Sequence, residues 1–188
     1  MPQLERGKAR VAALMAAAAA VFAEKGYDTA TMTEIAAGAG ASIGSLYQFF
    51  PTKELLAAAL HEAYLERLSG ELDRLREEAA GRPAAELGDQ LFERLADFLA
   101  QRPAFVALAE RRDIDKARKR ATRALLRRQI AAILAQAAPP LPPGAPEVMA
   151  VVILHLMRAM ITLSGDDEEV GPPAVAVFRR MLRAYLAG

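Results

Sequence analysis

Residues 31–50 read TMTEIAAGAGASIGSLYQFF, and this stretch decides the fold. Glu34 follows Thr31 by three positions, which is the spacing of a capping box at the start of a helix. The small residues at 38–41 interrupt that helix, and Ser42 is placed to cap another. The stretch therefore predicts two short helices joined by a tight turn, which is the helix-turn-helix pattern.

The two short helices have an apolar side and an outward side. Apolar residues spaced to hold the pair against a preceding helix, through Phe22, are Ile35, Ala36, Leu46 and Phe50. The outward side of the second helix carries Ile43, Gly44, Ser45, Tyr47 and Gln48. Because the second helix of this pattern enters the major groove of DNA, we expect that side to contact DNA. Gln48 is the expected base reader, since a glutamine amide pairs with the donor and acceptor of adenine together, and Ile43 is placed to meet a thymine methyl.

Proline and glycine divide the rest of the chain into helical stretches, and no stretch alternates with the period of a strand. Helices are expected at about 4–25, 31–38, 42–50, 53–80, 84–101, 103–111, 113–137, 146–164 and 172–187. The predicted fold class is therefore all-α, with about nine helices. We expect residues 1–52 to form a DNA-binding domain and residues 53–188 a helical ligand-binding and dimerisation domain.

The composition argues against several classes of function. Hydrophobic residues make up 53% of the 188, so the chain can bury a sizeable core. The sequence has no cysteine and two histidines, and it shows no glycine-rich phosphate loop or carboxylate cluster. We therefore expect no enzyme, no metal site and no cofactor, and the lack of cysteine fits a cytoplasmic protein. No apolar stretch is expected to reach the roughly 18 residues of a membrane span, so no membrane partner is expected.

Bulk charge does not predict an affinity for DNA. The net charge is +1, and the five basic and five acidic side chains of residues 1–54 cancel. Affinity must then come from the placement of charges. The placed charges are Arg6, Lys8 and Arg10 on a leading arm and Lys53 at the start of a helix, where phosphate is favoured.

The first 60 residues or so resemble a known family at many separated positions. FAEKGY at 22–27, TMTEIA at 31–36, AG at 39–40 and SIGSLYQFFPTK at 42–53 resemble the tetracycline-repressor (TetR) family. Ile43 stands where the family often has a lysine, and Phe49 stands where it often has a tyrosine or a histidine. The resemblance implies contacts to phosphates or groove edges of double-stranded operator DNA from Thr31, Thr33, Ser45, Tyr47 and Lys53. It also implies a homodimer, usually a repressor, with a part that binds a small-molecule effector.

The last two expected helices are apolar enough to join two copies of the chain. The helix at 146–164 is apolar nearly all round, and the helix at 172–187 has an apolar stripe. A chain of this length has few elements to cover both, so we expect them to pair with their copies in a four-helix interface. The expected contact residues are Val152, Leu156, Phe178, Met181, Leu182 and Tyr185.

A small, largely apolar effector is expected among the helices between residues 53 and 164, because ligand sites are mostly apolar with a few placed polar groups. The candidate pocket residues are His61, Tyr64, Phe98, Phe105, His155 and Arg158. For His61 the alternative is an ordinary packed histidine. His155 and Arg158, with Thr162, form a polar stripe that either rims the dimer contact or points into the cavity.

The densest positive charge lies outside the expected DNA-binding domain. The basic side chains of residues 111–128 are Arg111, Arg112, Lys116, Arg118, Lys119, Arg120, Arg123, Arg127 and Arg128. Alanine and leucine recur along one side of the same helix, so a solvated basic face is expected. The alternative is a helical adaptor or membrane-surface protein, or one that binds an acidic ligand through this helix.

Overall fold

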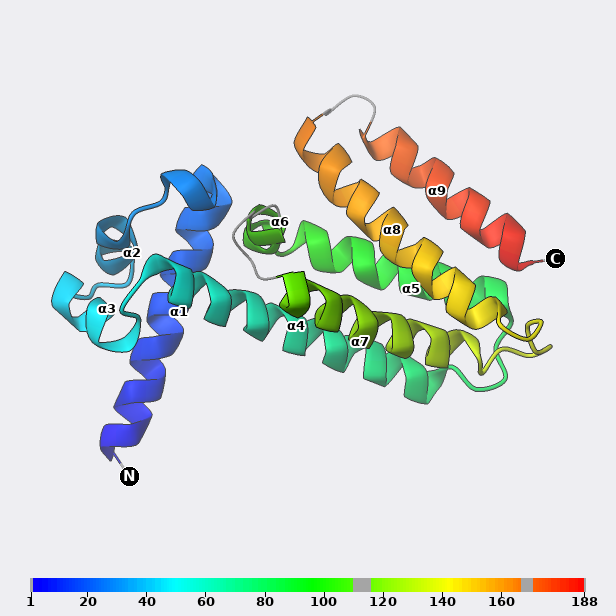
Figure 1. The fold of residues 1–188 in the computed structure, drawn as a ribbon, viewed down its shortest axis with the longest axis horizontal. Coiled ribbons are helices and arrows are strands. Elements are labelled where there is room, and N and C mark those ends of the chain that lie inside the picture. The colour runs from blue at the N-terminus through cyan, green and yellow to red at the C-terminus, as the bar shows by residue number, and fades with distance from the viewer. Residues whose placement is uncertain (1, 110–115, 167–170, 188) are drawn as a thin grey trace. The chain divides into compact units, whose positions relative to one another are not determined.

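The structure, a computed structural model, describes residues 2–109, 116–166 and 171–187. These residues form nine helices and no strand (Figure 1). The helices are α1 (Pro2–Thr29), α2 (Met32–Gly38), α3 (Ile43–Phe49), α4 (Lys53–Glu78), α5 (Ala84–Ala100), α6 (Pro103–Ala109), α7 (Lys116–Leu134), α8 (Ala145–Asp166) and α9 (Gly171–Leu186). The expected all-α fold with an N-terminal helix-turn-helix is confirmed. The expected helix limits at 111 and 113 lie outside the described residues.

Helix α1 bends at the glycine that was expected to end it. Gly26 has φ 75° and ψ 169°, outside the helical region, so α1 is two helices joined at this residue. A side chain with a Cβ is strained at that φ, which explains why glycine occurs here. The shorter piece ends at Thr29. Residues 26–31, which we call the α1–α2 connection, therefore change the direction of the chain before α2 begins.

The chain packs as two compact units. The first comprises Met1–Glu66 and Arg102–Asp113, and the second comprises Arg67–Gln101 and Ile114–Gly188. Helix α4 contributes its first turns to the first unit and its remainder to the second, and α6 belongs to the first unit. The functional boundary expected after residue 52 stays a prediction, because compactness does not report which residues bind DNA or ligand.

The core of the first unit lies where α1 meets the helix-turn-helix. Phe22 of α1, Ile35 of α2 and Leu46 of α3 are fully buried in one cluster. Ala104 and Leu108 of α6 belong to the same cluster, and α6 packs against α1. Burying a large apolar side chain stabilises a fold by about 1.5–3 kcal/mol. The expected packing of the two short helices against Phe22 is confirmed, and it leaves the other side of α3 free to face outward.

In the second unit α9 is attached to α5 by apolar and ionic contacts. A Cβ at Gly88 would clash with Leu186 Cδ1, so glycine lets the two helices approach closely. Asp89 accepts hydrogen bonds from Arg179 Nε at 3.1 Å and from Arg183 Nη1 at 2.7 Å. These contacts set which side of α9 faces outward.

Helix α8 contains a longer apolar stretch than we expected from the sequence. Its stretch Ala145–Leu163 is long and apolar enough to cross a membrane by length and composition alone, which corrects the expectation that no such stretch exists. In the second unit, however, α8 packs against α5, α7 and α9 and buries Met149, Ile153 and Met157. Only 33% of the stretch is buried in the single chain. The helix therefore has one side in the core and one side that is still uncovered.

Candidate nucleic-acid interface

Helices α2 and α3 begin at the caps that the sequence predicts. The Thr31 hydroxyl accepts a hydrogen bond from the Glu34 N–H at 3.3 Å, and the Glu34 carboxylate accepts one from the Thr31 N–H at 3.1 Å. Ser42 Oγ accepts a hydrogen bond from the Ser45 N–H at 3.1 Å. Between the helices Gly40 takes the left-handed conformation with φ 59°. The caps and this turn together set the angle between α2 and α3.

The outer side of α3 is open to solvent. Leu46 is buried and holds the helix to the core, whereas Ile43 and Tyr47 are 40% and 47% exposed. Gln48 is exposed and Ser45 is half-buried. Large side chains that are exposed to solvent together on one short helix are typical of a surface that contacts another molecule. The structure thus places together, on one accessible side, the residues expected to read DNA.

Gly44 and Phe49 complete that surface. Gly44 is exposed, and a Cβ there would meet no atom within 4 Å. Packing inside the protein therefore gives no reason for a glycine, whereas close approach of an outside molecule does. Phe49 is also exposed, although it was not expected among the contact residues. It precedes Phe50, which is buried, and the sequence alone does not tell which of two adjacent phenylalanines faces outward.

The start of α2 carries an ion pair. Lys25 Nζ lies 2.6 Å from Glu34 Oε1. This hydrogen bond, followed by those from Thr31, lowers the pKa of Glu34 to about 2. The Thr31 hydroxyl donates to Glu34 Oε2 at 2.8 Å, so it is engaged in the cap, while Thr33 is exposed. Both threonines are accessible on the first unit, but only Thr33 has a hydroxyl that the cap does not use.

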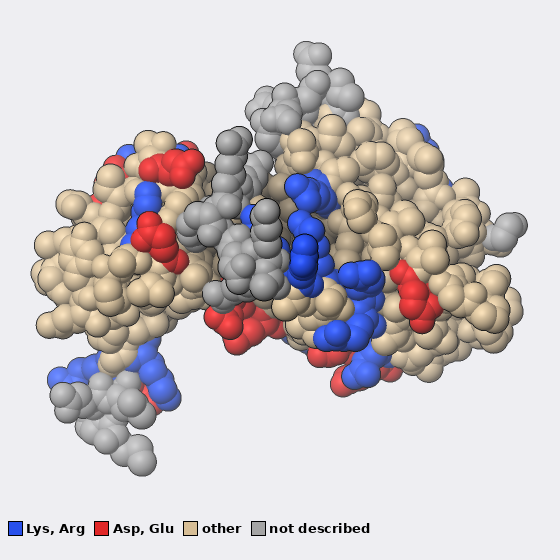
Figure 2. Space-filling model, viewed as in Figure 1, with Lys and Arg blue, Asp and Glu red and all other residues tan. Residues whose placement is uncertain are grey.

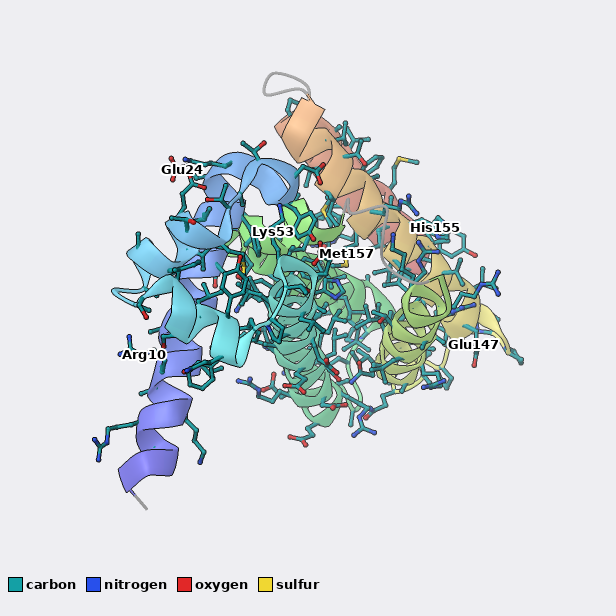
Figure 3. The ribbon with its side chains drawn as sticks, turned by 60° about the vertical axis from the view of Figure 1, so that its left-hand side comes forward. Arg10, Glu24, Lys53, Glu147, His155 and Met157 are labelled. Carbon is teal, nitrogen blue, oxygen red and sulfur yellow. The ribbon has the colours of Figure 1, made fainter. Side chains whose placement is uncertain are left out.

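Lys53, the first residue of α4, is engaged inside the chain. Its ammonium donates hydrogen bonds to the carbonyl oxygens of Tyr27, Asp28 and Ala30, at 2.8, 3.1 and 2.9 Å. The nitrogen also lies 4.6 Å from the centroid of the Tyr27 ring. Figure 3 shows Lys53 where α4 begins, among the helices of the first unit. The sequence predicts a phosphate contact for this residue, and the structure shows three carbonyl partners that the sequence did not reveal.

Basic side chains occur together on the first turns of α1. Arg6, Lys8 and Arg10 lie on these turns, which are helical and not an extended arm. Lys8 pairs with Glu5 at 3.2 Å. Arg10 Nη1 lies 3.4 Å from the carbonyl oxygen of Gly40, so one positive charge sits beside the turn between α2 and α3.

Three of the expected pocket residues meet in the first unit. The ring of His61 stacks on Phe105 with 5.4 Å between centroids, and Tyr64 meets Phe105 edge-on at 6.0 Å. This contact joins α4 to α6, and it agrees with the packed alternative for His61. In the second unit, Phe98 is buried on the apolar side of α5.

His155 and Arg158 are exposed on α8 in the single chain, and their expected place in a pocket stays a prediction. His155 Nδ1 lies 2.7 Å from the carbonyl oxygen of Val151, one turn earlier. Figure 3 shows His155 on the outer side of α8, and Met157, which is buried, on the other. Exposure favours the other alternative for the two polar residues, the rim of a contact between copies.

An apolar face, which we call the α8–α9 face, covers the outer side of the last two helices. Its exposed members are Val148, Val152, Val177, Met181 and Tyr185, with Met181 at 64% and Tyr185 at 69%. Leu156 and Phe178 are half-buried. Leu182 is buried near Gly88 in the single chain, and its expected place in the dimer contact stays a prediction. A face of this kind, rimmed by polar residues, is typical of a protein–protein contact.

The basic helix α7 presents arginines to solvent. The exposed ones that have no hydrogen-bond or ion-pair partner among the described residues are Arg120, Arg123, Arg127 and Arg128. Figure 2 shows basic side chains gathered over this part of the second unit. Arg111 and Arg112, and the side chains of Lys116 and Arg118, lie outside the described residues. A solvated basic face stays the prediction for this helix.

Metal-binding side chains do not gather in the part of the chain that the structure describes. No group of three or more His, Cys, Asp or Glu residues there could hold a metal ion. The candidate contact surfaces among the described residues are the outer side of α3 and the α8–α9 face.

Comparisons with known proteins agree with this geometry. The family model described as bacterial regulatory proteins, tetR family, matches residues 14–60, and the model described as tetracyclin repressor-like, C-terminal domain, matches residues 83–186. An uncharacterized HTH-type transcriptional regulator, YerO of Bacillus subtilis (strain 168), is 34% identical over 79 residues. The match covers 42% of this chain and 27% of that protein, so it spans about a quarter of the relative's length.

Two solved structures have a similar fold. FadR from Bacillus subtilis, a transcriptional regulator in complex with stearoyl-CoA, has a TM-score of 0.70 and 18% identity, with 94% of this chain and 97% of that chain covered. NalD, the secondary repressor of the MexAB-OprM multidrug efflux pump in Pseudomonas aeruginosa, has a TM-score of 0.60 and 22% identity, with 84% of each chain covered. At these identities the likeness establishes the fold alone.

Proposed function

The chain belongs to the tetR family of bacterial transcriptional regulators, and from this premise we propose that it is a repressor that binds an operator in the cytoplasm as a homodimer. A small-molecule effector releases it from DNA. The observation that carries the proposal is the outer side of α3, where Ile43, Tyr47 and Gln48 are exposed while Leu46 is buried. A helix held in this way can enter a major groove without rearrangement of the core.

Hydroxyl groups on α2 and α3 supply the contacts that place the protein on the DNA backbone. Tyr47 and Ser45 reach phosphates from α3, and Thr33 does so from α2, because hydroxyls and backbone N–H groups commonly bind phosphate oxygens. Thr31 supports these contacts from the start of α2 by capping that helix, because its own hydroxyl is engaged with Glu34. These contacts are the same on every DNA sequence, so they set register and not preference.

Sequence preference comes from two side chains and one glycine of α3. The Gln48 amide pairs with the N6 and N7 groups of an adenine, and Ile43 packs on a thymine methyl group. Gly44 adds no side chain, which lets the backbone of α3 lie close to the floor of the groove. Each correct bidentate pair contributes roughly 1–3 kcal/mol of discrimination against the wrong base.

The α8–α9 face joins two copies of the chain in this proposal. One helix-turn-helix reads half a site, and a pair related by two-fold symmetry reads a palindrome with half-sites one or more helical turns apart. Val152, Met181 and Tyr185 supply the apolar contact, and His155 and Arg158 supply its polar rim. The half-exposed side of α8 is then buried by the partner's copy, as an apolar helix in a soluble assembly requires.

The effector binds in the helical C-terminal part. Helix α5 buries a continuous apolar side that includes Phe98, and ligand sites are mostly apolar. The structure of FadR contains stearoyl-CoA, which agrees with an apolar ligand for this architecture. Helix α4 begins at the helix-turn-helix and meets α6 through His61, Tyr64 and Phe105, so a ligand that favours one position of α4 alters DNA affinity. A coupling of about 1–3 kcal/mol between the two sites is ordinary.

Selection from a library of randomised duplexes tests the proposal. We expect enrichment of a palindrome whose half-sites have centres about 10 base pairs, or a multiple, apart. A helical adaptor that used the basic helix α7 would bind duplexes without enriching any sequence. Absence of enrichment would therefore contradict the regulator and favour the adaptor.

A further inference from the structure

Lys53 has more partners inside the chain than a phosphate-binding lysine needs. An ammonium has three N–H donors and no acceptor, and three carbonyls at 2.8–3.1 Å, those of Tyr27, Asp28 and Ala30, account for all the donors. The nitrogen also lies 4.6 Å from the centroid of the Tyr27 ring, a cation–π contact. A phosphate oxygen would have to displace or share one of these partners.

The three carbonyls belong to the α1–α2 connection, in which Gly26 leaves the helical conformation. They carry partial negative charge, so a cation is favoured beside them. Tyr27 donates its hydroxyl to Glu54 Oε1 at 3.3 Å, and its ring lies 5.7 Å from that of the buried Phe22. The first two residues of α4 thus hold the connection to the core.

We infer that Lys53 is a positioning residue for the recognition helix α3 and not a phosphate ligand. Ala30 directly precedes Thr31, the N-cap of α2, so holding the Ala30 carbonyl fixes where α2 begins. Helix α2 carries α3 through the turn at Gly40. Without the ammonium the connection loosens, and α3 leaves the angle at which it enters a groove. The inference rests on the proposed function, because this angle matters for binding only if α3 reads DNA.

Two substitutions separate positioning from phosphate binding. Lys53→Met removes the charge and the three donors but keeps an apolar stem. Lys53→Arg keeps the charge, yet its planar fork cannot direct three donors from one nitrogen atom to three carbonyls. A phosphate contact therefore survives in Lys53→Arg, whereas the positioning contact is lost in both variants. Lys119→Met removes one lysine charge from α7 in the second unit and is the matched control.

We expect both Lys53 variants to bind the selected operator roughly 10- to 100-fold more weakly, which is the range for losing hydrogen bonds to a charged group. Lys119→Met should stay within about twofold of the unsubstituted protein, because Lys119 belongs to the second compact unit and not to the helix-turn-helix. In the absence of DNA, amide hydrogen exchange over residues 27–49 should be faster in both Lys53 variants, since the connection opens more often. The unsubstituted protein and Lys119→Met should exchange alike.

A different set of results overturns the inference. A Lys53→Arg variant with the operator affinity and exchange rates of the unsubstituted protein would assign Lys53 to a phosphate. A fall of about 0.9 per protomer in the salt slope, seen in Lys53→Met alone, would do the same. Unchanged exchange rates in both variants would also overturn it. If the unsubstituted protein shows no sequence preference, the proposed function fails instead. The exchange measurement then still decides the positioning role, because it needs no DNA.

Discussion

Gln48 and Tyr47 are adjacent on the exposed side of α3, and their chemistry toward DNA differs. The Tyr47 hydroxyl reaches a phosphate, so Tyr47→Phe should weaken binding to every sequence alike, by about 0.5–1.5 kcal/mol for one neutral hydrogen bond. Gln48→Ala should relax preference at one base position of each half-site, at a cost of roughly 1–3 kcal/mol. Binding profiles of both variants over a randomised operator library measure this. An unchanged preferred sequence in Gln48→Ala would show that another residue reads the base.

Glu34 gives the first unit a dependence on pH. Its pKa is lowered to about 2, chiefly by the hydrogen bond from Lys25, so the ionised carboxylate stabilises the folded state. A carboxyl with a depressed pKa contributes fully above its unfolded value, near 4.5, and that contribution is lost as the pH falls toward 2. We expect Glu34→Gln to melt at a lower temperature at pH 7, by a margin that shrinks between pH 4.5 and 2. Carbon-13 NMR titration of the Glu34 carboxyl should give a midpoint near 2, and a midpoint at its ordinary value would contradict the ion pair.

Among the secondary-structure elements, α9 provides the clearest test of assembly. Met181 is 64% exposed on the α8–α9 face, and a charge placed there would be buried by the second copy. We expect Met181→Glu to raise the dissociation constant of the dimer roughly 100-fold or more, because an unpaired buried charge costs several kcal/mol. Arg180→Gln, which makes the same change in net charge at an exposed neighbouring position, should remain dimeric. Sedimentation equilibrium measures both, and a monomeric unsubstituted protein would refute the interface.

The elements that could be predicted from the sequence are those whose signals are local. The capping box of Thr31 and Glu34, the Ser42 cap and the break at Gly26 each act within a few residues, so they identify the helix-turn-helix directly. The partners of Lys53 lie more than 20 residues earlier in the chain and are carbonyls, which no side-chain pattern reveals.

Which side of a helix faces inward is also a non-local property. Leu182 belongs to the same apolar stripe as Met181, but α5 covers only part of that stripe, at Gly88. The side chain of Leu182 is therefore in the core while Met181 faces solvent. The stripe read from the sequence joins both, because periodicity records apolar character and not the position of the neighbouring helix.

At the scale of the whole molecule, charge is placed where it does little for specific binding. The net charge of the chain is +1, and the exposed arginines of α7 lie in a different compact unit from the helix-turn-helix. Attraction to DNA through bulk charge is non-specific and falls steeply with salt. Preference for one sequence must then come from the few side chains on the outer side of α3. The proposed function therefore requires specificity for one DNA sequence and not affinity alone.

The measurement that tests this most directly is the ratio of two dissociation constants, for the selected operator and for a scrambled duplex of the same composition. Fluorescence anisotropy titrations at about 50 and 200 mM salt supply it. We expect the operator to bind roughly 10³-fold more tightly or better, and the preference to persist at the higher salt while both affinities fall. A ratio near one at both salt concentrations would contradict the account, because the chain would then bind duplexes by charge without reading their sequence.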